Sequence, residues 1–155
     1  MLRLNIGKKE AFKKITPFCA YQERSHQQVK EKLYSFGLYK NEVEELISKL
    51  IEHNFLNEER YAEVFAGGKF RIKGWGKVKI KYELKQQGVS DYCIKKALSA
   101  IDAEDYYNKC NELFENKKNT LSKEKNIFSK RKKIQSYLLQ KGYESSIIND
   151  FIKTL

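Results

Sequence analysis

Three segments of the chain share one pattern of apolar positions around a glycine. Aligned on Gly37, Gly88 and Gly142, they carry apolar residues eight and four positions before the glycine. Nearly all positions one, six, nine, ten and thirteen after it are apolar as well. The residues eight positions before the glycine are Val29, Ile80 and Ile134. Those four positions before it are Leu33, Leu84 and Leu138. These intervals are helical. Because the glycines are 51 and 54 residues apart, the chain contains an internal repeat with a period near 50.

Each repeat therefore contains two helices joined at the glycine, which ends the first helix at positive φ. Asn41, Ser90 and Ser145 are the expected caps of the second helices. A further helix precedes each pair, at residues 57–71 and 103–118 in the second and third repeats. In the first repeat we expect Thr16 to cap that helix, with Pro17 at its first position.

The predicted fold is all-α, a tandem repeat of three three-helix units. Each unit consists of a helix-turn-helix-like pair and the helix before it. The predicted units are residues 1–55, 56–102 and 103–155. Repeats that contact only their neighbours stack into an elongated, curved molecule.

Residues 69–82 also fit a different structure. Basic and apolar residues alternate on both sides of "GWG", which is typical of a β-hairpin, and "KVKIKYEL" alone favours a strand. However, Ile80 and Leu84 occupy repeat positions of a helix, and "YELKQQ" is helix-forming. We therefore predict a helix here, with "KGWG" as the break before it.

Composition agrees with a helical, non-membrane protein. One proline and eight glycines are few for a sandwich or barrel. No apolar run approaches the ~20 residues of a membrane span, and the first ten residues lack a signal peptide's apolar stretch. The three cysteines, Cys19, Cys93 and Cys110, are odd in number and far apart. We interpret them as reduced, packed thiols of a cytoplasmic protein.

The sequence offers no set of residues for catalysis. Its two histidines, His26 and His53, fall in different units, and no Cys or His pair has metal-ligand spacing. "AGGKF" at residues 66–70 follows a helix rather than a strand, unlike a phosphate-binding loop. We predict a protein that is not an enzyme and that needs no cofactor or metal.

The charge is high and unevenly distributed. The net charge of +11 favours a polyanionic partner or an acidic protein surface. Residues 67–88 carry seven basic and one acidic side chain, and residues 117–141 carry nine and one, whereas residues 40–66 have a net charge of −4. A solvated face is the simpler interpretation. Two basic blocks in equivalent parts of successive units favour a binding face.

Three stretches resemble the RecX family of bacterial recombination regulators: residues 21–33, 55–65 and 73–89. Arg24 and Ser25 fit the family's Arg-Ser at the start of the second helix. The other matches are Leu56, Glu58, Arg60, Tyr61 and Ala62, then Lys73, Gly74, Gly76, Ile80, Leu84, Gly88 and Val89. Asn54 and Asn57 depart from the family's usual Gly and Asp, and Pro17 lies where its first helix is usually continuous.

The resemblance implies a non-enzymatic protein that lies in the groove of the RecA–DNA filament, and we expect it to act as a monomer. It would restrain the ATPase, strand-exchange and co-protease activities of RecA. A helical protein that binds single- or double-stranded DNA directly is the alternative. The candidate partner-binding residues are Arg24, Arg60, Lys69, Arg71, Lys73, Trp75, Lys77, Lys130 and Arg131. Trp75 is either an interface anchor or a core residue.

Overall fold

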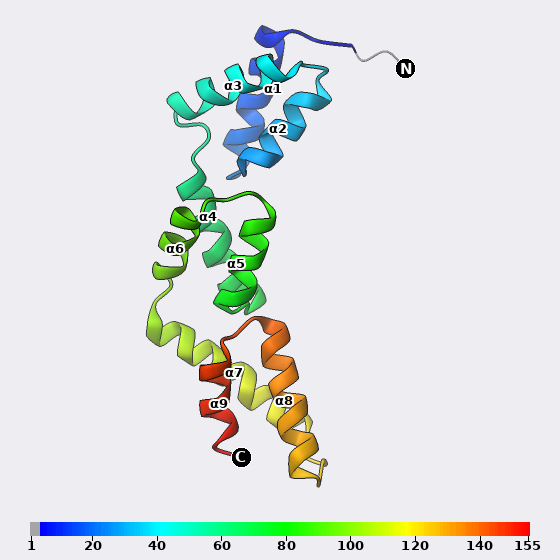
Figure 1. Cartoon of the computed structure of the whole chain (residues 1–155), viewed down its shortest axis with the longest axis vertical. Helices are drawn as coiled ribbons and strands as arrows, with labels where there is room; N and C mark the ends of the chain where they lie inside the picture. Colours follow the sequence, from blue (N-terminus) through cyan, green and yellow to red (C-terminus); the bar gives the residue numbers. More distant parts are fainter. Residues whose placement is uncertain (1–3) are drawn as a thin grey trace.

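The computed structural model describes residues 4–155, and within them the chain forms nine α-helices, one π-helical turn and no strand. The helices stack in three groups along the long axis, with α1 and α9 in the two outer groups (Figure 1). The first group comprises α1 (Lys8–Tyr21), α2 (His26–Ser35) and α3 (Lys40–Glu52). The second comprises α4 (Glu58–Gly68), η1 (Lys69–Lys73), α5 (Lys77–Gln86) and α6 (Asp91–Ser99). The third comprises α7 (Ala103–Thr120), α8 (Ile127–Lys141) and α9 (Ser145–Ile152). The all-α repeat prediction is confirmed.

The repeated apolar positions form the core. The residues eight and four positions before each glycine are all 0% exposed: Val29, Ile80, Ile134, Leu33, Leu84 and Leu138. Most of the positions after the glycine are also buried, although Leu98, Ile152 and Leu155 are only partly so. Ile80 and Leu84 lie on α5, so the hairpin alternative for residues 69–82 is excluded.

The turn glycines adopt the predicted conformation, with φ of 84° at Gly37, 76° at Gly88 and 97° at Gly142. Ser90 caps α6 as expected, because its side chain accepts a hydrogen bond from the Cys93 amide at 3.3 Å. The other two cap predictions were wrong, since α3 and α9 begin at residues 40 and 145. At the start of α3, the side chain of Glu42 instead accepts a hydrogen bond from the Tyr39 backbone amide at 2.9 Å.

The expected start of the first helix was also wrong. Helix α1 begins at Lys8 and continues through Pro17. Proline has no N–H for the carbonyl four residues earlier, which here belongs to Lys13. The hydroxyl of Thr16 donates to that carbonyl at 3.4 Å instead. Thr16 therefore compensates the proline inside the helix rather than capping a new one.

The buried residues form two separate clusters. One belongs to the first helical group and runs from Ala11 to Leu56, whereas the other is continuous through the second and third groups. The second and third groups therefore share a core, and the first group is joined to them by other contacts. No helix in residues 4–155 is long and apolar enough to cross a membrane.

Candidate functional site

The turn η1 presents basic side chains at the surface of the middle unit. Arg71 and Lys73 are exposed, Lys69 is half-buried, and Ile72 between them is 82% exposed. The turn ends at Gly74, whose φ of 69° suits glycine and stops the helix. Phe70 points inward and is buried, so it anchors η1 to the core and leaves its neighbours outside. This turn therefore carries three of the predicted partner-binding residues on one element.

Trp75 lies between a core and a surface position. It is partly buried, and its ring meets Phe65 edge to face at a centroid distance of 6.4 Å. The Nζ atoms of Lys69 and Lys79 lie 5.0 and 4.6 Å from the ring centroid. Cations over an indole ring are attracted by its negative face. Trp75 thus orders two of the surrounding lysines, and part of its ring stays accessible.

The glycines of "GWG" have a structural role that the sequence did not indicate: they join the second and third units. The Gly76 amide donates to the Lys141 carbonyl at 2.8 Å, and the Val78 amide donates to the Gly142 carbonyl at 2.9 Å. A Cβ on Gly76 would lie 2.4 Å from the Gly142 carbonyl group. The two backbones can meet this closely only because neither residue carries a side chain. We call this contact the glycine joint.

Buried tyrosines reinforce the glycine joint. The Tyr106 hydroxyl accepts from the Lys77 amide at 2.9 Å and donates to the Glu144 carboxylate. The Tyr143 hydroxyl donates to the Gly74 carbonyl at 3.0 Å. Burial raises the pKa of Tyr106 and of Tyr143 well above the ordinary tyrosine range, so both remain neutral donors. The backbone around "GWG" is therefore held rigidly.

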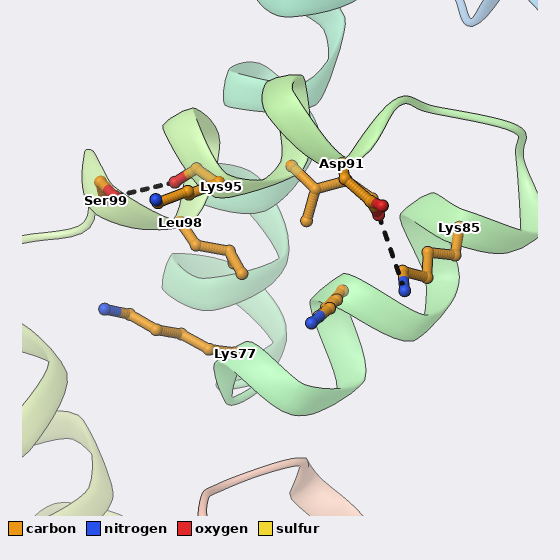
Figure 2. Close-up of a pocket in the computed structure, with 8 residues that line it drawn as sticks. Lys77, Lys85, Asp91, Lys95, Leu98 and Ser99 are labelled. Carbon is orange, nitrogen blue, oxygen red and sulfur yellow. Dashed lines mark hydrogen bonds and ion pairs between the residues drawn. The ribbon is translucent and has the colours of Figure 1, made fainter.

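Lys77 also lines an open groove between α5 and α6 (Figure 2). The groove has a volume of about 360 Å³ and contains Ile94 and Leu98 beside a set of charged side chains. The charged residues are Lys77, Lys81, Lys85, Asp91 and Lys95. Of these, only Lys77 was among the predicted site residues. We call this feature the lysine groove.

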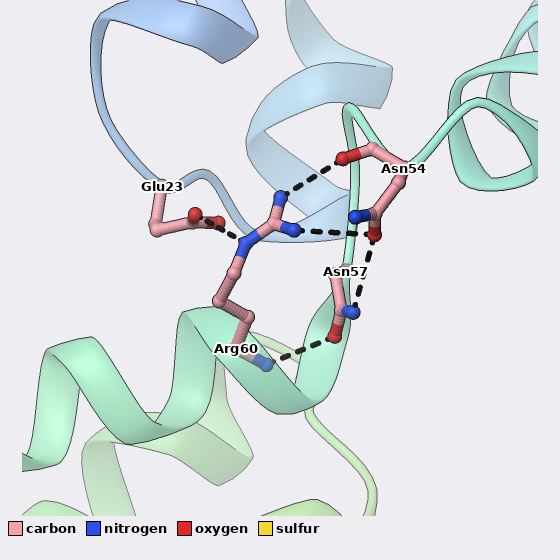
Figure 3. A network of polar contacts seen from close by, with 4 residues as sticks. All are labelled: Glu23, Asn54, Asn57 and Arg60. Atoms are coloured by element: carbon pink, nitrogen blue, oxygen red, sulfur yellow. Dashed lines mark hydrogen bonds and ion pairs between the residues drawn. The ribbon is translucent and has the colours of Figure 1, made fainter.

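The arginines of the family motifs point into the protein itself. The Arg24 guanidinium lies 3.9 Å from the Phe18 ring centroid and donates through Nε to the Phe18 carbonyl at 3.0 Å. Arg60 pairs through Nε with Glu23 and donates to the Oδ1 and carbonyl oxygens of Asn54, each at 3.1 Å (Figure 3). Arg60 therefore ties the start of α4 to the α1–α2 loop, across the junction where the core is interrupted.

The two predicted basic blocks meet only through Lys141, whose Nζ donates to the Lys73 carbonyl at 3.2 Å, and Lys130 and Arg131 stay apart from the other predicted site residues. Lys130 and Arg131 lie near the start of α8, whereas the end of α8 forms the glycine joint. The intervening helix separates Arg131 from the joint by roughly 15 Å. Arg131 is half-buried and donates to the carbonyl of the C-terminal Leu155 at 3.1 Å. It therefore supports the packing of the C-terminus.

Within residues 4–155 no cluster of three or more His, Cys, Asp or Glu side chains could hold a metal ion. All three cysteines are free thiols and buried, and burial raises the pKa of Cys110 to about 12. The Cys110 thiol is therefore a poor nucleophile, because little of its thiolate forms at neutral pH.

Comparison with known proteins identifies related sequences for most of the chain. Residues 57–98 match the family description of the second three-helix domain of RecX, and residues 104–152 match that of the third. The chain is 34% identical over 133 residues to the regulatory protein RecX of Clostridium perfringens (strain 13), and 36% identical over 131 residues to that of Clostridium botulinum (strain Eklund 17B). These alignments cover 85% and 84% of this chain but 62% and 61% of the relatives, so the chain spans about three fifths of their length.

Solved structures share the same fold. The crystal structure of RecX from Lactobacillus salivarius matches with a TM-score of 0.86 and 27% identity, over 96% of both chains. A second crystal structure, of a regulatory protein RecX, matches with a TM-score of 0.85 over 96% of this chain and 72% of that one. It is 21% identical and supports the fold alone.

Proposed function

The chain belongs to the RecX family, and we propose that it binds the RecA–DNA filament and inhibits the activities of the recombinase. The activities concerned are ATP hydrolysis, strand exchange and co-protease function. The protein acts as a monomer inside the cell and has no catalytic activity of its own. The proposal keeps the division into three units that the sequence predicts, residues 1–55, 56–102 and 103–155.

The observation that carries this proposal is the basic face of η1 on a long stack of helices. A stack of this shape can follow a helical groove along several protein subunits (Figure 1). Arg71 and Lys73 are exposed at the surface of the middle unit, on either side of the exposed Ile72 in the sequence. Cationic side chains around an exposed apolar residue suit an acidic protein surface with an apolar centre.

Residues around this face prepare it for binding. The glycine joint fixes the third unit against the second, and Trp75 orders the ammonium groups of Lys69 and Lys79. A surface that is already ordered loses less conformational entropy on binding. In this proposal Arg24 and Arg60 contribute by holding the first unit in place, while the cationic residues of η1 contact the partner.

The proposal is tested by the RecA ATPase on single-stranded DNA, with and without this protein. The parent should lower the rate of ATP hydrolysis. For the variant Arg71→Glu with Lys73→Glu, about tenfold more protein should be needed for the same inhibition. This corresponds to a loss of about 1.4 kcal/mol in binding free energy. Both residues are exposed, so thermal stability should stay nearly unchanged.

A matched control comes from α1, where Lys13→Glu with Lys14→Glu makes the same change in net charge at two exposed positions. This control should inhibit like the parent. Equal inhibition by the η1 variant, the control and the parent would show that η1 is only a solvated face. Lys130 and Arg131 would then be the next candidates for the binding site. An ATPase rate unaffected by the parent would refute the proposed function.

A further inference from the structure

The lysine groove combines an excess of positive charge with an apolar base. Four lysines and one aspartate line it, a net charge of +3. Lys85 pairs with Asp91 at 3.6 Å, and in Figure 2 the Lys77 and Lys95 side chains extend at the other end of the groove. The other three lysines therefore have no carboxylate within the groove to neutralise them. The groove is open to solvent, and an extended ligand could lie along it.

Three of the lysines form a row. Lys77, Lys81 and Lys85 follow one another at intervals of four residues on α5, so their side chains share one face about 6 Å apart along the axis. Like charges at this spacing oppose helix formation. The row of lysines therefore does not stabilise α5. A ligand with regularly spaced negative charges would neutralise the positive charges of these lysines.

The other two units provide an internal comparison. At the four positions equivalent to Lys77, Lys81, Lys85 and Lys95, counted from the turn glycine, the first unit has His26, Lys30, Tyr34 and Glu44. The third unit has Arg131, Gln135, Leu139 and Asn149. Both units form the same helical pair with these residues. The fold therefore does not require lysine at these positions, and the fully basic set is a property of the middle unit.

We propose that the lysine groove binds the phosphate backbone of a nucleic-acid strand, without reading its sequence. Lysine ammonium groups act as point charges that suit phosphates and carry no base specificity. This binding is independent of the proposed action on RecA, because the groove lies on α5 and α6 and not on η1.

The test is fluorescence anisotropy of a short labelled single-stranded oligonucleotide, titrated with the protein alone at low salt. Lys81→Glu with Lys85→Glu should weaken binding by about tenfold or more, because binding depends on the charges that neutralise phosphate. The Lys13→Glu with Lys14→Glu variant should bind like the parent. Lys81→Gln with Lys85→Leu places the third unit's own residues in the groove, and circular dichroism checks its fold. In this variant the slope of log affinity against log salt should decrease by about 1.4.

Three results would overturn the assignment. The first is equal affinity of the groove variants and the α1 control, and the second is no binding of the oligonucleotide by the parent. The third is displacement of the oligonucleotide by polyglutamate as efficiently as by unlabelled DNA, which would indicate an acidic protein ligand. The Arg71→Glu with Lys73→Glu variant should still bind the oligonucleotide, so failure of the RecA proposal and failure of this one give different results.

Discussion

Gly76→Ala tests whether the glycine joint holds the second and third units together. Gly76 has φ of −80° and ψ of 168°, which alanine adopts without strain, so any cost comes from the contact across the joint. The added methyl group would lie 2.4 Å from the carbon and the oxygen of the Gly142 carbonyl. Because both are backbone atoms, the two units must separate to admit it.

The magnitude follows from what that separation breaks. The hydrogen bonds from the Gly76 and Val78 amides are directly affected, and each contributes about 1 kcal/mol net. Steric overpacking adds about 1 kcal/mol at its lower limit. We expect a loss of about 2–3 kcal/mol, or a fall in melting temperature of roughly 4–12 °C for a chain of this size.

Gly68→Ala is the matched control. Gly68 is helical, and a Cβ there would meet nothing within 4 Å. Alanine at such a position stabilises by about 0.4–1 kcal/mol through the unfolded chain. Both variants are measured by circular dichroism during heating and urea titration. If Gly76→Ala melts at the parent's temperature while Gly68→Ala is unchanged or raised, the joint does not bear on stability and the reasoning fails.

Two further predictions concern the core. Leu84→Ala should lower the free energy of unfolding by about 2–5 kcal/mol in urea denaturation, because Leu84 is 0% exposed, and a loss below about 0.5 kcal/mol would contradict its place in the core. The second prediction concerns pH. Burial raises the pKa of Cys110 from 9.0 to about 12 and also raises the pKa values of Tyr106 and Tyr143. Keeping these three groups neutral therefore stabilises the fold below about pH 9, and this stabilisation is lost as the pH rises. The melting temperature should therefore fall as the pH rises from about 9 to about 12, and a flat profile would show that these groups ionise without cost.

The repeat made the fold predictable from sequence. Positions such as Leu33, Leu84 and Leu138 recur at fixed distances from a glycine, and a recurring helical stripe overrides local alternation such as that around Ile80. The helix starts were less predictable. Thr16 and Pro17 have the composition of a helix N-terminus, but the Thr16 hydroxyl takes over the hydrogen bond that proline lacks, so α1 continues.

The candidate site was predicted only in part, because its determinants come from contacts between distant residues. Nothing local to Gly76 shows that it meets Gly142, and nothing in the motif around Arg60 shows that its guanidinium contacts Glu23 and Asn54. Counting charge along segments found the basic stretch of α5 and η1. It missed the lysine groove because the contribution of Lys95 comes from the next helix.

The most direct test of the central claim is co-sedimentation of this protein with RecA filaments formed on single-stranded DNA. Free RecA and the DNA alone serve as separate arms, at a salt concentration that suppresses simple binding to DNA. We predict that the protein sediments with the filament, that Arg71→Glu with Lys73→Glu weakens this association, and that Lys13→Glu with Lys14→Glu does not. A protein that stays in the supernatant with filaments at every concentration would contradict the account.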